Sequence, residues 1–505
     1  MNNLRELLET RAAAMPQKNW LFSSADDRRW TYAEFNAAAN RAANLLRSLG
    51  IGKGDKVSLL MNNSAEYVLA YFACWKLGAV AGPVNSHLKS EELAYVLNNS
   101  EAVALITEQG FLKHVAPIRA ELQHLRHVLT TDAEDEGAIP FSAAAAQSDK
   151  LDAAPLNAED DAIIIYTSGT TGKPKGVLLT HRNILANARQ ITDWLHFTDA
   201  DRLLCVMPLF HVNGIIVTTV TPMFAGASMV VAPKFSAGRH WHVISDYEVT
   251  SFGSVATMLA MLSRTYPDGV PAGLDISRLR FALCGSAPVP AEVMRQFERQ
   301  FNCLVIEGYG LSESTCRATF NPPNENRRPG SCGLPIGCEL KIFDDDDQEL
   351  GTGEVGEIVL RGENLLKGYF KNPEATAKAF RSGWFHTGDV GYRDADGFLF
   401  IVDRKSDMII RGGENIYPRE IDEVLYQHPA VQDAATIGVK DPLYGEEVKA
   451  FIVLKDGAQA TEAELIAHCR AHLADFKCPK TIEFLSAIPK GPTGKLLKRE
   501  LAAGS

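Results

Sequence analysis

The chain has 505 residues, of which 46% are hydrophobic and 22% charged, a composition that is typical of a folded enzyme and excludes a disordered chain. The formal net charge of −11 argues against a nucleic-acid-binding surface. Neither a long apolar run nor an apolar signal core is present, so we expect a cytoplasmic protein without a membrane span. The nine cysteines, none in a C-x-x-C pair, are expected to be reduced and mostly buried.

Apolar runs alternate with helical patterns through most of the first 400 residues. The run at 56–61 precedes an amphipathic pattern at 64–77, which is followed by a second run at 80–84. This alternation predicts an α/β fold with a large N-terminal domain of layered, largely parallel sheets and helices. The acidic, alanine-rich segment 132–155 is interrupted by glycine and proline, and we expect it to connect two subdomains at the surface.

Residues 166–177 read YTSGTTGKPKGV and lie between two apolar runs, which predicts a loop that joins two strands. Glycines let several backbone N–H groups converge on an anion, hydroxyls donate further hydrogen bonds, and lysines add positive charge. The loop is not a Walker A motif, because Lys173 is followed by Pro174, which disfavours a helix. We predict that the loop binds a polyphosphate and that the protein is therefore an enzyme that uses ATP. The alternative is an ordinary glycine-rich hairpin.

The motif EGYGLSE at 307–313 follows an apolar run, which places it at the end of a strand, where open α/β sheets expose ligand sites. Glu313 offers a hard oxygen ligand of the kind that Mg²⁺ requires beside a polyphosphate. Thr315, Cys316 and Arg317 are more polar than the lining of a hydrocarbon channel. We expect Arg317 to point to solvent, whereas a buried arginine there would suit an anionic ligand group such as a carboxylate or a sulfonate.

Glycines and charges concentrate at DADG 394–397 and DRKSD 403–407, before a smaller unit that extends to the C-terminus. We predict an N-terminal domain at 1–403, a hinge at 404–406, and a small mobile C-terminal α+β domain at 407–505. The motif PKGPTGK at 489–495 ends in Lys495. Its position after a glycine- and proline-rich loop makes this lysine a candidate for a functional cation, although lysines near a chain end are normally exposed to solvent.

These motifs resemble, in type and in order, those of the acyl-, aryl- and carnitine-CoA synthetases of the adenylate-forming superfamily. The resemblance covers nearly the whole chain, from WTY at 30–32 to Gly494 and Lys495. The resemblance implies that a small carboxylic acid and ATP form an acyl-adenylate and diphosphate, and that coenzyme A then gives acyl-CoA and AMP. It also implies Mg²⁺ as the metal, held by Glu313.

The resemblance assigns roles residue by residue. Lys495 is implied to be the adenylation lysine, and His211 to border the acid pocket and gate access of the thiol. The residues implied to bind ATP or AMP are Thr167, Ser168, Gly169, Thr170, Thr171, Gly172, Lys175, Gly285, Ser286, Ala287, Glu307, Gly308, Tyr309, Ser312, Asp389 and Arg404. The residues implied to bind coenzyme A are Gly412, Gly413, Tyr444, Phe476, Lys477 and Lys480. The residues implied to line the acid pocket are His211, Val212, Asn213, Gly310, Thr315, Cys316 and Arg317.

Within this assignment Tyr309 stacks on adenine and Asp389 binds both ribose hydroxyls. Ser406 corresponds to the hinge position. The chain departs from the family pattern at Ser312, where most relatives have threonine, and at Cys478, where some have an arginine that contacts coenzyme A. The hydroxyl at 312 is preserved, whereas at 478 we expect one phosphate contact of such relatives to be missing.

The acid is expected to be short or medium in length, or polar at its far end, because Asn213 and Arg317 buried against a hydrocarbon would lack hydrogen-bond partners. Within the family, a medium- or long-chain fatty acid or an aryl acid is the alternative substrate. An adenylating enzyme with an acceptor other than coenzyme A is a second possible function, and a non-catalytic nucleotide-binding regulator is a third. The oligomeric state is open.

Overall fold

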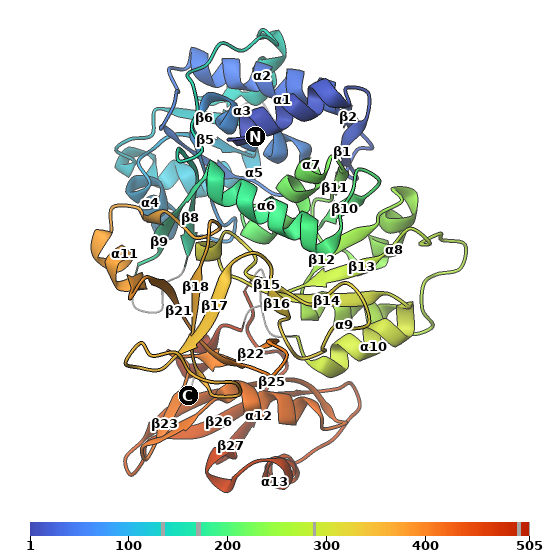
Figure 1. Cartoon of the computed structure of the whole chain (residues 1–505), viewed down its shortest axis with the longest axis vertical. Helices are drawn as coiled ribbons and strands as arrows, with labels where there is room; N and C mark the ends of the chain where they lie inside the picture. The colour runs from blue at the N-terminus through green and yellow to red at the C-terminus, as the bar shows by residue number, and fades with distance from the viewer. Residues whose placement is uncertain (133–136, 168–172, 286–288, 492–495, 504–505) are drawn as a thin grey trace.

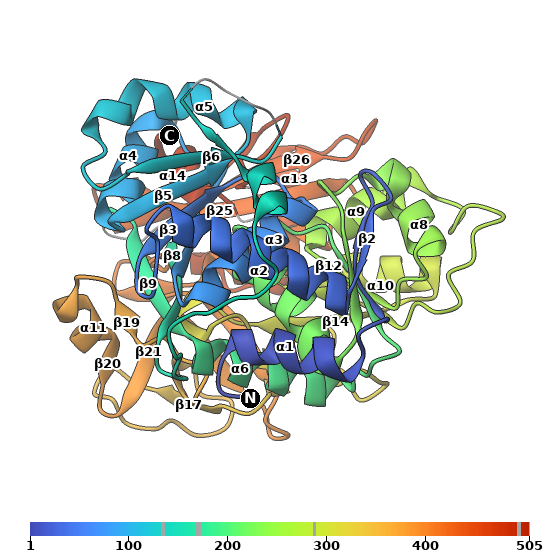
Figure 2. The ribbon, with the colours of Figure 1, turned by 90° about the horizontal axis from the view of Figure 1, so that it is seen from above.

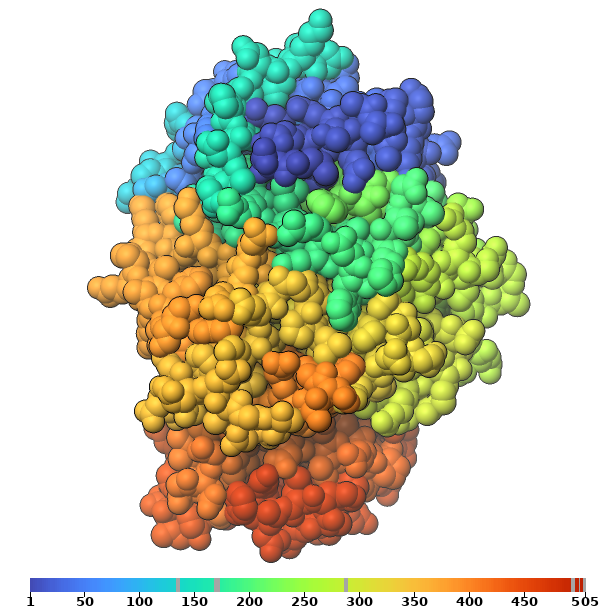
Figure 3. Space-filling model, viewed as in Figure 1, coloured from blue at the N-terminus to red at the C-terminus, as the bar shows by residue number. Residues whose placement is uncertain are grey.

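The structure is a computed structural model of the whole chain, and it describes all residues except 133–136, 168–172, 286–288, 492–495 and 504–505. Four sheets form most of the fold. Three of them share one hydrophobic core, which includes Leu59, Leu203 and Ile358 from the three sheets. The fourth belongs to the C-terminal part, which has a core of its own around Ile421 and Ile452. This lobe lies below the rest of the molecule in Figures 1 and 3.

The nine-stranded sheet has the order β16-β15-β14-β13-β12-β10-β11-β1-β2, and its strands from β14 to β1 run parallel. Its strands are β16 (Leu334–Pro335), β15 (Thr319–Phe320), β14 (Leu304–Tyr309), β13 (Phe281–Cys284), β12 (Ser251–Ser254), β10 (Arg202–Cys205), β11 (Ser228–Val231), β1 (Asn19–Ser23) and β2 (Arg29–Thr31). The carboxyl ends of β12, β13 and β14 therefore meet at one edge, where loops and ligands gather in such sheets.

The eight-stranded sheet has the order β19-β9-β8-β4-β3-β5-β6-β7 and is parallel from β8 to β7. Its strands are β19 (Gly368–Tyr369), β9 (Lys175–Thr180), β8 (Asp161–Thr167), β4 (Val80–Pro83), β3 (Lys56–Leu60), β5 (Ala102–Thr107), β6 (His127–Thr130) and β7 (Ile139–Pro140). The predicted strand, helix and strand at 56–84 are confirmed as β3, α3 (Ala65–Leu77) and β4. The segment 132–155 was expected to connect two subdomains, and that is wrong, because it joins β6 to β8 within this one sheet and contributes β7 to it. Most of its described residues are exposed or half-buried, as expected of a surface segment.

Helices cover these two sheets, and α1, α2 and α3 pack on one another at the N-terminal end (Figure 2). The helices of this part are α1 (Leu4–Ala14), α2 (Tyr32–Ser48), α3 (Ala65–Leu77), α4 (Ser90–Asn99), α5 (Gln109–Val115), η1 (Ala116–Glu121), η2 (Phe141–Ala146), α6 (His181–Leu195), η3 (Asn213–Val220), α7 (Thr221–Ala225), α8 (Ala237–Asp246), α9 (Ala256–Thr265), α10 (Ala291–Phe301), η4 (Ser312–Ser314) and α11 (Pro373–Ala379). In α6, Thr180 and Asn183 cap the N-terminus reciprocally, and His196 ends the helix in the left-handed conformation.

The third sheet is antiparallel, which the alternation in the sequence did not predict. Its strands are β17 (Glu339–Phe343), β18 (Gly356–Arg361), β21 (Trp384–Arg393), β20 (Phe380–Arg381) and β22 (Leu399–Arg404). Short turns such as the one at 394–398 link neighbouring strands, and such links allow antiparallel pairing without a crossover helix.

The C-terminal part is a small α+β unit, as predicted. Its strands are β23 (Ile409–Arg411), β24 (Glu414–Ile416), β25 (Val431–Asp441), β26 (Gly445–Leu454) and β27 (Thr481–Phe484), and its helices are α12 (Pro418–Tyr426), α13 (Glu462–His472), η5 (Asp475–Lys477) and α14 (Lys498–Ala503). The hinge at 404–406 and the mobility of this unit remain predictions. Within the described ranges, no helix combines the length and apolarity needed to cross a membrane.

All nine cysteines lie in the described part of the chain, and none forms a disulfide. Eight are buried and Cys338 is half-buried. Burial raises the pKa of several thiols, for example that of Cys284 to about 12. The prediction of reduced, buried thiols is confirmed.

Candidate active site

The predicted phosphate loop joins β8 and β9, which are antiparallel neighbours, so the prediction of a strand-to-strand loop is confirmed. Thr167 and Lys175 pair across the mouth of this loop. The Lys175 ammonium lies 5.1 Å from the centre of the Tyr369 ring, on β19. Ser168, Gly169, Thr170, Thr171 and Gly172 lie outside the described residues, as do Ser286 and Ala287 of the second predicted nucleotide loop.

Tyr309 ends β14 and contacts a residue that is eighty positions away in the sequence. Its hydroxyl donates a hydrogen bond of 2.6 Å to Oδ2 of Asp389, and both side chains are buried. Asp389 pairs with Arg404 across β21 and β22, and its Oδ1 lies 3.4 Å from the Arg404 Nε. Burial and the Asp389 carboxylate raise the pKa of Tyr309. Three residues predicted to bind the nucleotide therefore form one cluster.

The turn that carries Asp389 is supported by a carboxylate that the sequence did not single out. The Gly388 N–H donates a hydrogen bond of 3.1 Å to Oε1 of Glu357, a buried residue of β18. Arg381 Nη2 and Lys405 Nζ lie 3.1 Å and 3.8 Å from Oε2 of the same carboxylate. Glu357 thus holds the turn in place and is itself held by two cations.

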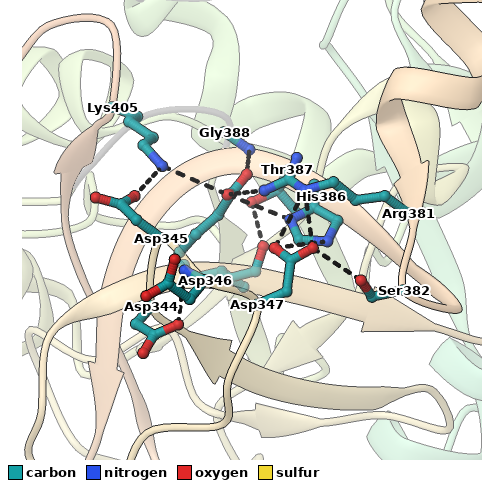
Figure 4. Close-up of polar contacts among 12 residues, drawn as sticks. Asp344, Asp345, Asp346, Asp347, Arg381, Ser382, His386, Thr387, Gly388 and Lys405 are labelled. Carbon is teal, nitrogen blue, oxygen red and sulfur yellow. Dashed lines mark hydrogen bonds and ion pairs between the residues drawn. The ribbon is translucent and has the colours of Figure 1, made fainter.

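An acidic run next to this turn carries further charges. Figure 4 shows Lys405 pointing toward Asp345, at 2.6 Å, while Ser382, Arg381 and His386 gather around Asp347. Lys405 belongs to the predicted hinge. The middle residue of the predicted hinge therefore contacts the loop that joins β17 to β18.

We expect Glu357→Gln to raise the KM for ATP about tenfold and to lower the free energy of unfolding by about 1–2 kcal/mol, because glutamine keeps one acceptor for the Gly388 N–H but removes the charge that faces Arg381 and Lys405. ATP kinetics and denaturant unfolding measure both effects. Asp345→Asn is the matched control, since the Asp345 side chain is exposed and its one ion pair within the described part of the chain is with Lys405, and it should have little effect. If Asp345→Asn changed the KM for ATP or the free energy of unfolding more than Glu357→Gln, the supporting role of Glu357 would be contradicted.

Glu313 lies in the short helix η4 and faces β19. Its Oε1 accepts a hydrogen bond of 3.1 Å from the Tyr369 hydroxyl, the same ring that Lys175 approaches. Burial raises the pKa of this carboxyl, and Asp389 and Arg404 act on it electrostatically. A half-buried carboxylate with one oxygen committed to a hydroxyl is suited to a hard cation that also has phosphate ligands. Within the described residues no three His, Cys, Asp or Glu side chains cluster as a metal site, so a cation here would depend on the phosphates.

Glu307 and Gly308 lie just before Tyr309 on β14. The Glu307 side chain is fully buried, its Oε1 lies 3.9 Å from Sγ of Cys332, and burial raises its pKa to about 7. A Cβ on Gly308 would lie 2.4 Å from the Phe320 ring, which explains the glycine. Direct nucleotide contacts of these two residues remain predictions.

The residues predicted to line the acid pocket come from two segments. His211 is half-buried, whereas Val212 and Asn213 are buried at the start of η3. Gly310 has no room for a side chain, since an added Cβ would lie 1.9 Å from the Cys316 carbonyl oxygen. Thr315, Cys316 and Arg317 are all buried.

Thr315 turns the chain sharply inward. Its φ of 67° and ψ of −50°, with a hydrogen bond of 2.8 Å from the Cys316 N–H to the Ser314 carbonyl, form a strained γ-turn. The Thr315 hydroxyl donates to the Asn364 carbonyl at 2.7 Å and is therefore already committed. The prediction that Arg317 points to solvent is wrong, because this turn carries its side chain into the interior, where the residue is 2% exposed.

The residues predicted to bind coenzyme A fall into two groups. Gly412 and Gly413, with φ of 59° and 93°, form the two-residue hairpin turn between β23 and β24, which requires left-handed conformations. Tyr444 lies beside them, since its carbonyl accepts a bond of 2.8 Å from the Gly412 N–H and its ring is partly exposed. Lys480 lies 3.5 Å from Asp441, whose Oδ1 binds the Tyr444 N–H.

Lys477 and Phe476 form the second group. Lys477 Nζ pairs with Glu420 of α12 at 2.7 Å and lies 5.9 Å from the centre of the Phe476 ring. Cys478 is buried. Lys495, the predicted adenylation lysine, lies outside the described residues.

Comparison with known proteins defines the family. Residues 8–370 match the AMP-binding enzyme family, and residues 420–495 match the AMP-binding enzyme C-terminal domain. The chain is 38% identical to a sulfoacetate–CoA ligase of Cupriavidus necator, with 99% of this chain and 97% of the relative covered. It is 36% identical to a long-chain-fatty-acid–CoA ligase of Mycobacterium tuberculosis, with 99% and 98% covered.

A solved structure agrees with these sequence relatives. The chain superposes on an anthranilate CoA ligase in complex with anthranoyl-AMP with a TM-score of 0.92 at 32% identity, over 99% of this chain and 97% of that chain. The chain therefore belongs to the AMP-binding enzyme family and is an acyl-CoA synthetase of the adenylate-forming superfamily, an acid–thiol ligase that uses ATP and coenzyme A.

Proposed function

We propose that this enzyme activates a short or medium carboxylic acid with a polar far end, and that the clustered residues described above carry out the first half-reaction. One line of contacts supports this assignment. Lys175 at the phosphate loop lies against Tyr369, Tyr369 binds Glu313, and Glu313 interacts electrostatically with the Asp389 and Arg404 pair. Side chains suited to phosphate, metal and ribose thus follow one another in the order of the groups in ATP.

In the first half-reaction a carboxylate oxygen of the acid attacks the α-phosphorus, and the bond to the bridging oxygen of diphosphate breaks. Asp389 accepts hydrogen bonds from the ribose hydroxyls, and Arg404 orients that carboxylate. Lys495 approaches on the C-terminal domain and stabilises the added charge around phosphorus. Glu313 would hold Mg²⁺, which neutralises charge on the phosphates when bound.

In the second half-reaction the thiol sulfur of coenzyme A attacks the acyl carbon, the thiol proton leaves, and the bond to the AMP oxygen breaks. The partly exposed Tyr444 ring and the neighbouring Lys480 ammonium suit the adenine and phosphates of coenzyme A. The turn at Gly412 and Gly413 has no side chains, so it leaves room for coenzyme A beside Tyr444 and Lys480. The half-buried His211 borders the path to the acid.

The experiment that tests the proposal is a panel of carboxylates assayed for AMP and diphosphate release with and without coenzyme A. We expect short and polar acids to give coenzyme A-dependent AMP release, with palmitate among the poorest. A clear preference for palmitate or for a benzoate over all short polar acids would contradict the assignment of the acid. That outcome would not contradict the ligase reaction itself.

The proposed hinge gives a prediction that separates the two half-reactions. We expect Ser406→Pro to slow thioester formation at least tenfold more than adenylation, because proline fixes φ where the C-terminal domain has to rotate. Single-turnover assays of each half-reaction measure this difference. Ser406 is exposed, so Ser406→Ala should leave both steps unchanged. Equal rates in Ser406→Pro and the wild type would place the pivot elsewhere.

A further inference from the structure

Arg317 is a buried cation with a single hydrogen bond from its side chain to the described residues. Nη1 lies 3.5 Å from the Gly308 carbonyl oxygen, and the guanidinium lies 5.2 Å from the centre of the Phe320 ring. Nε and Nη2 have no partner within the described residues. No acidic side chain of the described part lies within ion-pair distance of Arg317. A buried cation in this state is unfavourable until an anion binds it.

Glu307 acts on Arg317 electrostatically but does not form an ion pair with it among the described residues. Glu307 interacts more strongly with Arg419 than with Arg317. Burial raises the pKa of Glu307 to about 7, so a large share of this carboxyl is neutral near neutral pH. Glu307 therefore does not serve as the ion-pair partner of the Arg317 guanidinium.

Arg317 lies over the carboxyl edge of the nine-stranded sheet, at the ends of β13 and β14. Gly285 directly follows β13, and a Cβ at this position would lie 2.8 Å and 2.9 Å from Nη1 and Nη2 of Arg317. Glycine at 285 is thus what allows the guanidinium to lie there. Gly308, whose carbonyl Nη1 approaches, immediately precedes Tyr309 of the nucleotide cluster.

Asn213 lies over the same face of the neighbouring strand. A Cβ on Gly253 of β12 would lie 3.2 Å from Oδ1 of Asn213, and Gly253 pairs with Leu283, two residues before Gly285. Two residues along a strand and one strand across separate Gly253 and Gly285 by roughly 8 Å, and the Asn213 and Arg317 side chains lie against these two glycines. Within the described residues neither amide atom of Asn213 has a hydrogen-bond partner, and the residue is 1% exposed.

We propose that Arg317, assisted by Asn213, binds a second anionic group, a carboxylate or a sulfonate, at the far end of a short acid substrate. This inference rests on the proposed ligase function and names the substrate class. The planar fork of arginine can bind two oxygens of such a group at once, and the amide of Asn213 can donate to another. Because Arg317 lies so close to Tyr309, only a short chain separates the two acidic groups.

The test compares matched acids that differ in the distal charge. The kcat/KM of the wild-type enzyme is measured for malonate, succinate and sulfoacetate, and for propionate and butyrate as the monoanionic counterparts. We expect the best dianion to exceed its monoanionic counterpart at least 100-fold. The carboxylate and sulfonate arms show which anion is preferred. A wild-type preference for butyrate over all three dianions overturns the inference without any variant.

Arg317→Met removes the charge and keeps an unbranched side chain, and Arg317→Lys keeps the charge without the fork. We expect Arg317→Met to reduce the ratio of dianion to monoanion kcat/KM at least 100-fold and Arg317→Lys to reduce it about tenfold, with the KM for ATP unchanged in both. Equal losses for dianions and monoanions would mean that Arg317 binds the reacting carboxylate, or supports the fold, and would overturn the inference. Thermal unfolding identifies the second case.

The outcomes also separate this inference from the proposed function. Diphosphate release with butyrate but with none of the dianions refutes the inference alone. No release with any carboxylic acid refutes the proposed function.

Discussion

Replacing Lys495 with alanine is expected to abolish adenylation, with a loss of at least about 1000-fold, while thioester formation from a supplied acyl-adenylate proceeds within a few-fold of the wild-type rate. Two anions meet when the carboxylate approaches the α-phosphate, and the transition state adds charge around phosphorus. A cation that is present only in the closed arrangement stabilises that transition state and not the second one. Diphosphate release and acyl-CoA formation from synthetic acyl-AMP measure the two steps separately.

Lys490 is the matched control for this prediction. It belongs to the same loop, but its ammonium is paired with Asp433 of β25, so Lys490→Ala should leave adenylation largely intact. If Lys495→Ala lowered the rates of both half-reactions equally, the lysine would have a role in coenzyme A binding or in folding instead. A folded Lys495→Ala variant that adenylates normally would place the adenylation cation elsewhere.

Replacing Asp389 with alanine is expected to lower kcat/KM for ATP by about 100- to 1000-fold. The substitution removes the acceptor for two ribose hydroxyls, and each hydrogen bond to a charged group contributes about 1.5–3 kcal/mol. It also leaves the buried Tyr309 hydroxyl and the Arg404 guanidinium without their shared partner. Initial rates at varied ATP concentration, with the acid saturating, measure the effect.

Tyr309→Phe tests whether Asp389 acts through the ribose or through its protein contacts. This variant keeps the ring and removes only the hydroxyl that donates a hydrogen bond to Asp389. We therefore expect kcat/KM for ATP to fall about tenfold or less. If Tyr309→Phe lowers kcat/KM for ATP as much as Asp389→Ala does, the carboxylate serves mainly to position the tyrosine. A normal KM for ATP in Asp389→Ala would remove Asp389 from the ribose site.

Local chemistry made part of this architecture readable from the sequence. The strands that flank the phosphate loop, the strand before Tyr309 and the helix at 64–77 follow from side-chain periodicity and turn residues, which act over a few positions. The order of the motifs along the chain was specific enough to identify the superfamily. The antiparallel sheet was missed, because a pairing direction depends on how strands meet in space.

The sequence by itself determined the reaction class and the residue types available for it. Only the tertiary structure brought Tyr309 to Asp389, placed Glu357 beneath the Gly388 turn, and buried Arg317 over Gly285. These contacts join residues that are tens of positions apart, and no local pattern encodes such distances. The burial of Arg317 depends on a strained turn at Thr315 and on a glycine of another strand, so its environment exists only in the folded chain.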